Sequence, residues 1–213
     1  MMELIFYLSF FIFFILLSGV FVAKLIFNNK IDNLYIYEIG FLGIFFSTFL
    51  STFIHFFLPI NSTVNMFIIF FLLLNFIFFF NTKSLILKIS DNKLIIFISF
   101  LITLIMTVKY KPHEDYGFYH LPYIINVISE KIIFGLANLQ AQFAWNSTWL
   151  NFSSSLYLPF IELKGTQLSN SILYFFFLIF ILSKLFHNEK NKLSFYFILF
   201  FGFYCIIKFS RIS

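Results

Sequence analysis

Long apolar stretches dominate this sequence and constrain its fold more than any other feature. A helix that crosses the hydrocarbon core of a membrane needs about 20 residues, because each residue adds about 1.5 Å. The stretches that reach or approach this length cover residues 4–27, 39–60, 64–80, 94–108, 168–186 and 193–209. The fourth is short, and it reaches full length only if the long side chains of Lys93 and Tyr110 extend toward the headgroups. The sequence therefore predicts an all-α polytopic membrane protein with about six transmembrane helices in one transmembrane domain.

The composition also indicates that lipid is the solvent for most of the chain. Hydrophobic residues make up 61% of the sequence and charged residues 11%, whereas a soluble domain is about 25% charged. We interpret the 39 Phe residues as replacements for Leu on lipid-facing surfaces. The net charge of +5 comes from lysines scattered among apolar segments, so the sequence predicts no nucleic-acid partner. Cys205 is the single cysteine, which excludes an intramolecular disulfide framework.

Lysines between the apolar stretches predict an orientation, because cytoplasmic loops are enriched in Lys and Arg. The connections after the first, third and fifth stretches carry Lys24, Lys30, Lys83, Lys88, Lys93, Lys184, Lys190 and Lys192. By alternation these connections share one side of the membrane. The turn at Pro59 carries no lysine, and we expect it to join the second and third stretches as a helical hairpin. We therefore predict that the N-terminus and the loop of residues 109–167 lie outside, although that loop also holds lysines.

Polar side chains are concentrated directly after the fourth apolar stretch, in residues 109–120. Glu114 and Asp115 lie at the expected membrane–water boundary, where a carboxylate can act as a general base or bind a divalent cation. The alternative is a solvated loop whose acids neutralise Lys109 and Lys111. A zinc-protease motif is excluded, because Gly117 stands where the second histidine would be needed.

The rest of the long loop favours short helices lying along the membrane surface. Residues 118–157 are too few to bury an independent core, so their apolar side chains need the membrane interface or the ends of the spans. We expect two amphipathic helices separated by a turn at residues 135–138. The first would bury the face of Phe118, Leu121, Ile125 and Ile128, with Pro122 in its first turn. The second would begin at Asn146 or Ser147 and hold Trp149 at headgroup depth, either as an aromatic anchor or as a surface for a sugar or lipid headgroup.

Three strings in this loop resemble a group of bacterial multi-pass proteins. They are residues 115–120 (Asp-Tyr-Gly-Phe-Tyr-His), 135–139 (Gly-Leu-Ala-Asn-Leu) and 146–149 (Asn-Ser-Thr-Trp). Those proteins are similar in layout to GT-C glycosyltransferases, which use polyprenyl-phosphate-linked sugars. The resemblance covers residues 113–157 and the last few residues. Residues 208–213 resemble a stretch that continues into further spans, so we expect an N-terminal part of a longer enzyme that is inactive alone.

The resemblance implies an enzyme of the bacterial plasma membrane with its long loop outside. Asp115 matches the catalytic base or metal contact of that fold, with Glu114 beside it. The implied substrate-binding residues are Lys111, Tyr119, His120, Asn138, Asn146 and Trp149. The sequence departs from the family pattern at Gln140 and Gln142, where a His and an Arg usually follow the Asn-Leu pair. Those two positions therefore supply no basic group to bind a phosphate.

Two alternatives belong to other functional classes. A transporter or channel subunit would need ionisable residues well inside the spans, or helices broken by Gly or Pro at matching positions. Glu38 and His55 lie in the second stretch, but both are close to its ends. An accessory subunit would use the loop only to dock a partner.

Overall fold

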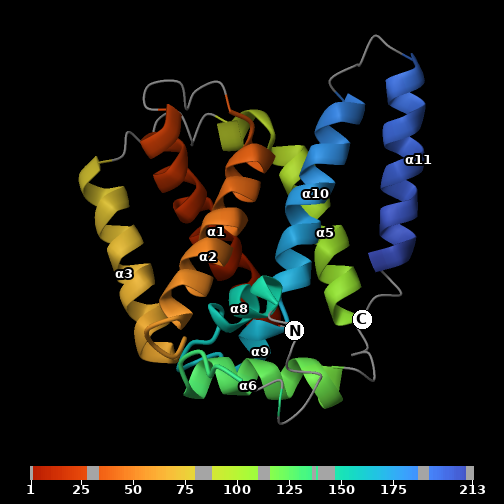
Figure 1. Cartoon of the computed structure of the whole chain (residues 1–213). Helices are drawn as coiled ribbons and strands as arrows, with labels where there is room; N and C mark the ends of the chain where they lie inside the picture. The colour runs from red at the N-terminus through yellow and green to blue at the C-terminus, as the bar shows by residue number, and fades with distance from the viewer. Residues whose placement is uncertain are drawn as a thin grey trace.

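The computed structural model describes residues 2–27, 34–79, 88–109, 116–135, 138, 147–186 and 192–209. Within those ranges all regular secondary structure is helical. The long helices are α1 (Met2–Phe27), α2 (Ile36–His55), α3 (Ser62–Phe79), α5 (Lys93–Val108), α10 (Ser169–Phe186) and α11 (Lys192–Phe209). Figure 1 shows them side by side, with the labelled short helices α6 (Leu121–Ser129), α8 (Thr148–Ser154) and α9 (Leu163–Thr166) at one end. The all-α prediction is confirmed for the described part of the chain.

Three helical segments are long and apolar enough to cross a membrane. They are Met2–Phe27, Ile36–His55 and Leu163–Phe186, with mean hydropathies of 2.6, 1.5 and 1.8. Shorter apolar helices cover Ser62–Phe76, Lys93–Val108 and Phe195–Cys205 among the residues described. Helix α5 has 16 residues, which gives it a length of about 24 Å, below the roughly 30 Å of hydrocarbon. The structure therefore supports a membrane protein with three candidate spans, and it does not support six.

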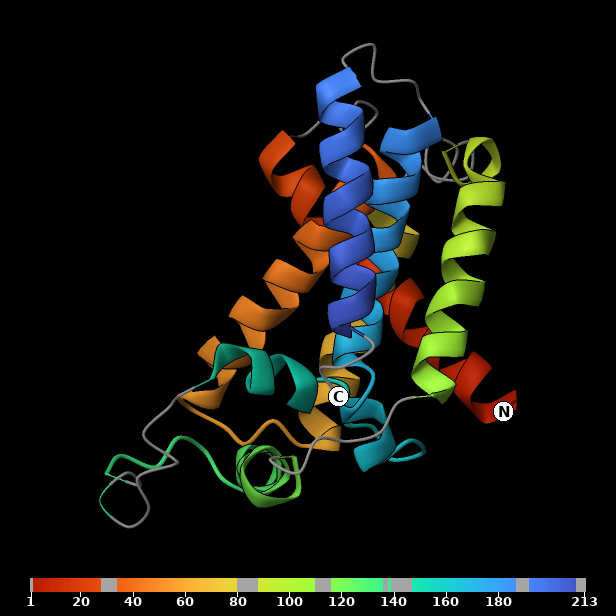
Figure 2. The same ribbon diagram turned by 90° about the vertical axis from the view of Figure 1, so that its right-hand side faces the viewer.

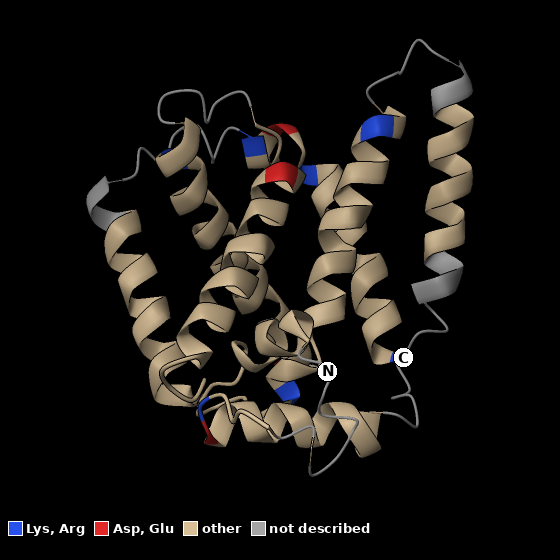
Figure 3. Ribbon diagram, viewed as in Figure 1, with Lys and Arg blue, Asp and Glu red and all other residues tan. Residues whose placement is uncertain are grey.

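Among the described residues, charged side chains lie at the two ends of the bundle. Figure 3 shows Lys, Asp and Glu at both ends of the described helices and none in the band between them. Lys24 and Lys184 lie in the last turns of α1 and α10, at the end where α2 begins with Glu38 in its first turn. At the opposite end Glu3 pairs with Lys164 at 3.7 Å. An uncharged band between charged ends is the distribution that a bilayer requires, because charges inside hydrocarbon are costly.

Two glycines allow α1 and α2 to touch backbone to backbone. A Cβ atom added at Gly19 would lie 1.8 Å from the Ile39 carbonyl oxygen. One added at Gly43 would lie 2.0 Å from the carbonyl oxygen of Ile15. No side chain fits at these distances, so the crossing depends on the missing Cβ atoms.

Helix α3 corrects the expected hairpin. Residues 56–61 join α2 to α3, but the two helices diverge from this turn, and α3 packs against α1 instead (Figure 1). Leu72 of α3 is buried in the main apolar core together with Phe11 and Phe14 of α1.

Helix α10 is a central helix of the bundle. It packs against α2, α5 and α11. Phe175 and Phe176 of α10 are almost fully buried, and Phe176 covers Gly40 of α2. The outer helix α11 is different, because Phe197, Phe200 and Phe203 are exposed along most of its length. An exposed phenylalanine face of this kind is suited to lipid.

Candidate functional site

The predicted catalytic segment leads into an unusual element, the π-helical turn η2 (Tyr116–His120). The apolar spacing predicts that helix resumes near Phe118, and it gives no sign of a π-helix. π-Helices are rare in proteins overall, and those that occur are often at functional sites. Phe118 is 72% exposed and Tyr119 39%, and His120 is exposed as well. The side chains of Phe118, Tyr119 and His120 are therefore accessible from outside the bundle, whereas the Tyr116 hydroxyl is buried.

Helix α6 (Leu121–Ser129) continues from η2 and lies across the end of the bundle (Figure 1). Figure 2 shows it end-on beneath α8 (Thr148–Ser154). The Ile60 N–H donates to the Val127 carbonyl at 2.9 Å, and the Ile132 N–H donates to the His55 carbonyl, also at 2.9 Å. These two backbone hydrogen bonds fix α6 to the turn between α2 and α3.

The buried face of α6 differs from the predicted one. Tyr123, Ile124 and Val127 face the bundle, whereas Ile125 is 47% exposed and Phe118 lies outside. Apolar residues occupy both sides of this helix, so spacing alone did not select the side that packs on Ile60. Pro122 does lie in the first turn, as predicted. Burial raises the pKa of the Tyr123 phenol, while a hydrogen bond with the Ser147 backbone acts in the opposite direction.

Helix α8 is folded into the end of the bundle rather than laid on its surface. Ser147 is its N-cap, as predicted, and its hydroxyl accepts from the Leu150 N–H at 3.4 Å. Residues Asn151, Phe152, Ser153 and Ser154 are all buried. Residues 151–154 are therefore held inside the end of the bundle, not on its surface, by a set of polar contacts with α2, α3 and α10. The headgroup depth expected for Trp149 stays a prediction.

We call this set of contacts the loop-end junction. The Asn65 amide on α3 donates to the Ser154 carbonyl at 3.0 Å and to the Tyr157 carbonyl at 2.9 Å. The Asn151 amide on α8 donates to the Thr52 hydroxyl on α2 at 3.3 Å. The Ser153 hydroxyl donates to that of Ser169 at 2.8 Å, and the Trp149 indole N–H donates to Asn170 at 3.0 Å. Each contact satisfies a polar group that would otherwise be stranded in an apolar interior.

A tight turn completes the junction on the side of α9 (Leu163–Thr166). A Cβ atom added at Gly165 would lie 2.2 Å from the Leu156 carbonyl oxygen, so the chain doubles back with its backbones in contact. Leu156, Leu158 and Ile161 are fully buried beside it. The segment from α8 to α9 therefore belongs to the core of the bundle.

The predicted site residues fall into three groups. Lys111, Glu114, Asp115 and Asn146 lie outside the described residues, and so does the predicted pocket around Asp115, His120 and Asn146. Tyr119, His120 and Asn138 are exposed, and Asn138 donates its N–H to the Gly135 carbonyl. Trp149 belongs to the loop-end junction. In the part of the chain that the structure describes, no three His, Cys, Asp or Glu side chains come together as metal ligands.

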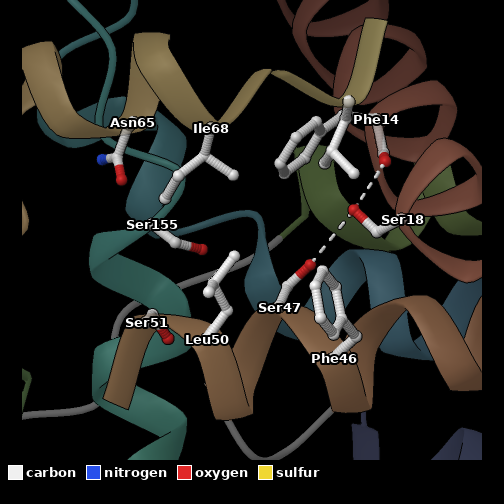
Figure 4. Close-up of a pocket in the computed structure, with 10 residues that line it drawn as sticks. Phe14, Ser18, Phe46, Ser47, Leu50, Ser51, Asn65, Ile68 and Ser155 are labelled. Carbon is white, nitrogen blue, oxygen red and sulfur yellow. Dashed lines mark hydrogen bonds between the residues drawn. The ribbon is translucent and has the colours of Figure 1, made fainter. Parts of the chain in front are cut away.

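A small cavity beside the junction was not predicted from the sequence. It lies between α1, α2, α3 and the end of α8, and Figure 4 shows Ser18, Ser47, Ser51, Asn65 and Ser155 around it. Ser47, Ser51 and His55 recur every four residues along α2, and all three are buried. This polar stripe in an otherwise apolar helix is the sequence signal that could have indicated a polar cavity.

Several polar atoms on the helices around the loop-end junction are buried without a hydrogen-bond partner. They include Asn65 Oδ1, Asn151 Oδ1 and His55 Nδ1. All three belong to the helices that meet at the loop-end junction. Unpaired buried polar atoms are uncommon in folded proteins, because most of them find a protein or water partner.

The comparisons with known proteins give one match. No curated protein and no solved structure matches this chain. A family described as a domain of unknown function, DUF8201, matches residues 1–213. The match covers the whole chain, and the protein belongs to this DUF8201 family.

Proposed function

We propose that this protein is a GT-C-like membrane glycosyltransferase, or the N-terminal part of one, that transfers a sugar from a polyprenyl-phosphate donor. The observation that supports this proposal best is the π-helical turn Tyr116–His120, which directly follows Glu114 and Asp115 in the chain. It presents exposed aromatic and imidazole groups at one end of an apolar bundle. Such a turn beside an acid pair is a reasonable setting for transfer chemistry at a membrane surface.

In this proposal Asp115 is the general base, assisted by Glu114 and, if the enzyme uses one, a divalent cation. Asp115 removes the proton of an acceptor hydroxyl as its oxygen attacks the anomeric carbon. The bond between that carbon and the phosphate oxygen breaks, and polyprenyl phosphate leaves with the electron pair. Lys109 and Lys111 neutralise the phosphate, and Tyr119 and His120 hold the sugar or phosphate.

The remaining substrate-binding roles follow the same resemblance. Asn138, Asn146 and Trp149 contribute to the sugar side of the site, and the phenylalanine-rich helices provide an apolar surface for the polyprenyl tail. The proposal includes six spans, with the shorter apolar helices crossing together with the three longer ones. It also puts the end with α6 on the outer face of a bacterial plasma membrane, as the lysine distribution favours.

Substitution of Asp115 tests the proposal, and Asp91 supplies a matched control. Asp91 is exposed and lies just before α5, whereas Asp115 follows that helix in the sequence. Each codon is changed to Asn in the chromosomal gene, so that the natural gene product is assayed in native membranes. The measurement is transfer of radiolabelled sugar from polyprenyl-phosphate donors to membrane and polysaccharide acceptors.

We expect Asp115→Asn to reduce transfer by at least about 100-fold, the usual range for a lost general base. Asp91→Asn should retain the wild-type rate, and both variants should be present in equal amounts. Wild-type transfer by Asp115→Asn would remove this residue from the mechanism. No transfer from any polyprenyl-phosphate donor by the wild-type protein would refute the proposed activity.

The structure offers less support for the transporter alternative. Among the described residues, no Asp, Glu, Lys or Arg is buried inside the bundle. Ion-coupled transport usually relies on such groups within the spans. An accessory role remains the competing explanation, and the transfer assay distinguishes it from catalysis.

A further inference from the structure

The small cavity beside the loop-end junction has a volume of about 10 Å³ for the centre of a water-sized sphere. One bound water needs about 10–15 Å³ on this measure. The wall is part apolar, from Phe14, Phe46 and Leu72, and part polar, from serines and Asn65. The cavity therefore has room for a single small molecule, and the polar wall determines which one.

Asn65 contributes an acceptor to this wall. Its amide nitrogen donates to both the Ser154 and Tyr157 carbonyls, which fixes the amide orientation, because an oxygen at that position would face two other oxygens. Figure 4 shows the amide nitrogen turned away from the cavity. The side chain is 1% exposed, and its Oδ1 atom has no hydrogen-bond partner. A strong acceptor is thus left unpaired in the wall.

The serine hydroxyls of the wall also offer oxygen lone pairs rather than protons. Each hydroxyl already donates a hydrogen bond. Ser18 donates to the Phe14 carbonyl at 3.1 Å, and Ser47 donates to the Ser18 hydroxyl at 3.4 Å. Ser51 donates to the Thr48 carbonyl at 3.0 Å, and Ser155 donates to the Phe152 carbonyl at 2.7 Å. A hydroxyl has one proton and two lone pairs, so the remaining capacity of these oxygens is to accept. The polar wall consists of acceptors only.

The geometry points to one internally bound water molecule in this cavity, which donates one hydrogen to Asn65 Oδ1 and the other to a serine hydroxyl oxygen. An apolar molecule would leave Asn65 Oδ1 unpaired. A dehydrated monovalent cation would fit the acceptors, but no Asp or Glu lines the cavity to offset its desolvation. Water supplies two donors without charge, and it would join α3 to α2 or α8 through the polar wall.

A methyl group added to the wall distinguishes a hydrated cavity from a dry one. Ser155→Thr keeps the hydroxyl that donates to the Phe152 carbonyl and adds one methyl group beside the cavity. If water is bound, the methyl group displaces it and strands Asn65 Oδ1, so the melting temperature in detergent should fall by about 2–4 °C. Ser51→Thr makes the same change from α2. Ser129→Thr is the control, because Ser129 is exposed at the end of α6, and it should leave the melting temperature unchanged.

Two further measurements test for the water in the unmodified protein. An experimental structure should show a single density peak about 2.7–3.2 Å from Asn65 Oδ1. Melting temperatures in sodium, potassium and choline chloride at equal ionic strength should agree. No density peak, a higher melting temperature for both cavity variants, or a rise specific to sodium or potassium would each overturn the assignment of water.

Discussion

Helix α2 is held in two different ways along its length. Near its middle, Gly43 meets α1 backbone to backbone, and the contact is close because no side chain intervenes. Near its end, the Thr52 hydroxyl accepts a hydrogen bond from the Asn151 amide of α8. Helix α3 is bonded to α8 as well, because the Asn65 amide donates to the Ser154 carbonyl. Dispersion and close fit hold the first contact, whereas polar satisfaction holds the second. The comparison explains why a loop segment can be buried in a bundle of apolar helices.

The glycine contact should show the largest effect. Gly43→Ala adds one Cβ atom 2.0 Å from the Ile15 carbonyl oxygen, so the two backbones must separate. We expect a loss of about 2–3 kcal/mol in unfolding free energy, despite the better helix propensity of Ala. Gly117→Ala is the matched control, because its Cβ atom meets nothing within 4 Å. Reversible unfolding in detergent measures both, and an equal response would mean that α1 and α2 are not in close contact.

The polar contact should show the next largest effect. Asn65→Leu removes the donor of two hydrogen bonds and leaves the Ser154 and Tyr157 carbonyls unpaired, at an expected cost of about 2 kcal/mol. Asn75→Leu on the same helix is the control, because its amide donates only to the Phe71 carbonyl one turn earlier. That variant should lose less than about 0.5 kcal/mol. If the two substitutions cost the same, Asn65 does not anchor α8 and the following turn to α3.

The smallest effect should come from the surface pair at the same end. Glu3 and Lys164 are 3.7 Å apart, and both side chains are 73% exposed. Glu3→Gln should change the unfolding free energy by less than about 0.5 kcal/mol, because solvent and salt screen exposed ion pairs. A loss as large as that of Asn65→Leu would show that charge, and not the buried amides, holds this end together.

The difference between these contacts also explains which features could be predicted from sequence. Apolar stretches, the Ser147 cap and Pro122 are local signals, and the structure contains the corresponding helices and ends. The burial of α8 depends on Asn65 and Ser154, which are 89 residues apart, so no local pattern reveals it. The face of α6 was missed because Ile124 and Ile125 are equally apolar and only the docking surface separates them.

The candidate site is predicted less completely than the fold. Asp115 and Glu114 were chosen for their residue types and by resemblance, and they remain a prediction because they lie outside the described residues. Tyr119 and His120 were expected to bind substrate, and their exposure in a π-helical turn is compatible with that role. The acceptor-lined cavity could not be predicted, because the sequence does not show which groups the serine hydroxyls donate to. Only those partners reveal that the hydroxyl oxygens facing the cavity are acceptors.

The most direct test of this account is whether α8 is packed inside the end of the bundle. Ser153 and Ser169 are both buried, with their hydroxyl oxygens 2.8 Å apart. Ser171 lies two residues further along α10 but bonds to Thr107 of α5. In a Cys205→Ser background, Ser153→Cys with Ser169→Cys should form a disulfide in oxidised membranes, as detected by mass spectrometry of linked peptides. Ser153→Cys with Ser171→Cys should not, and equal cross-linking of both pairs, or none in the first, would contradict the account.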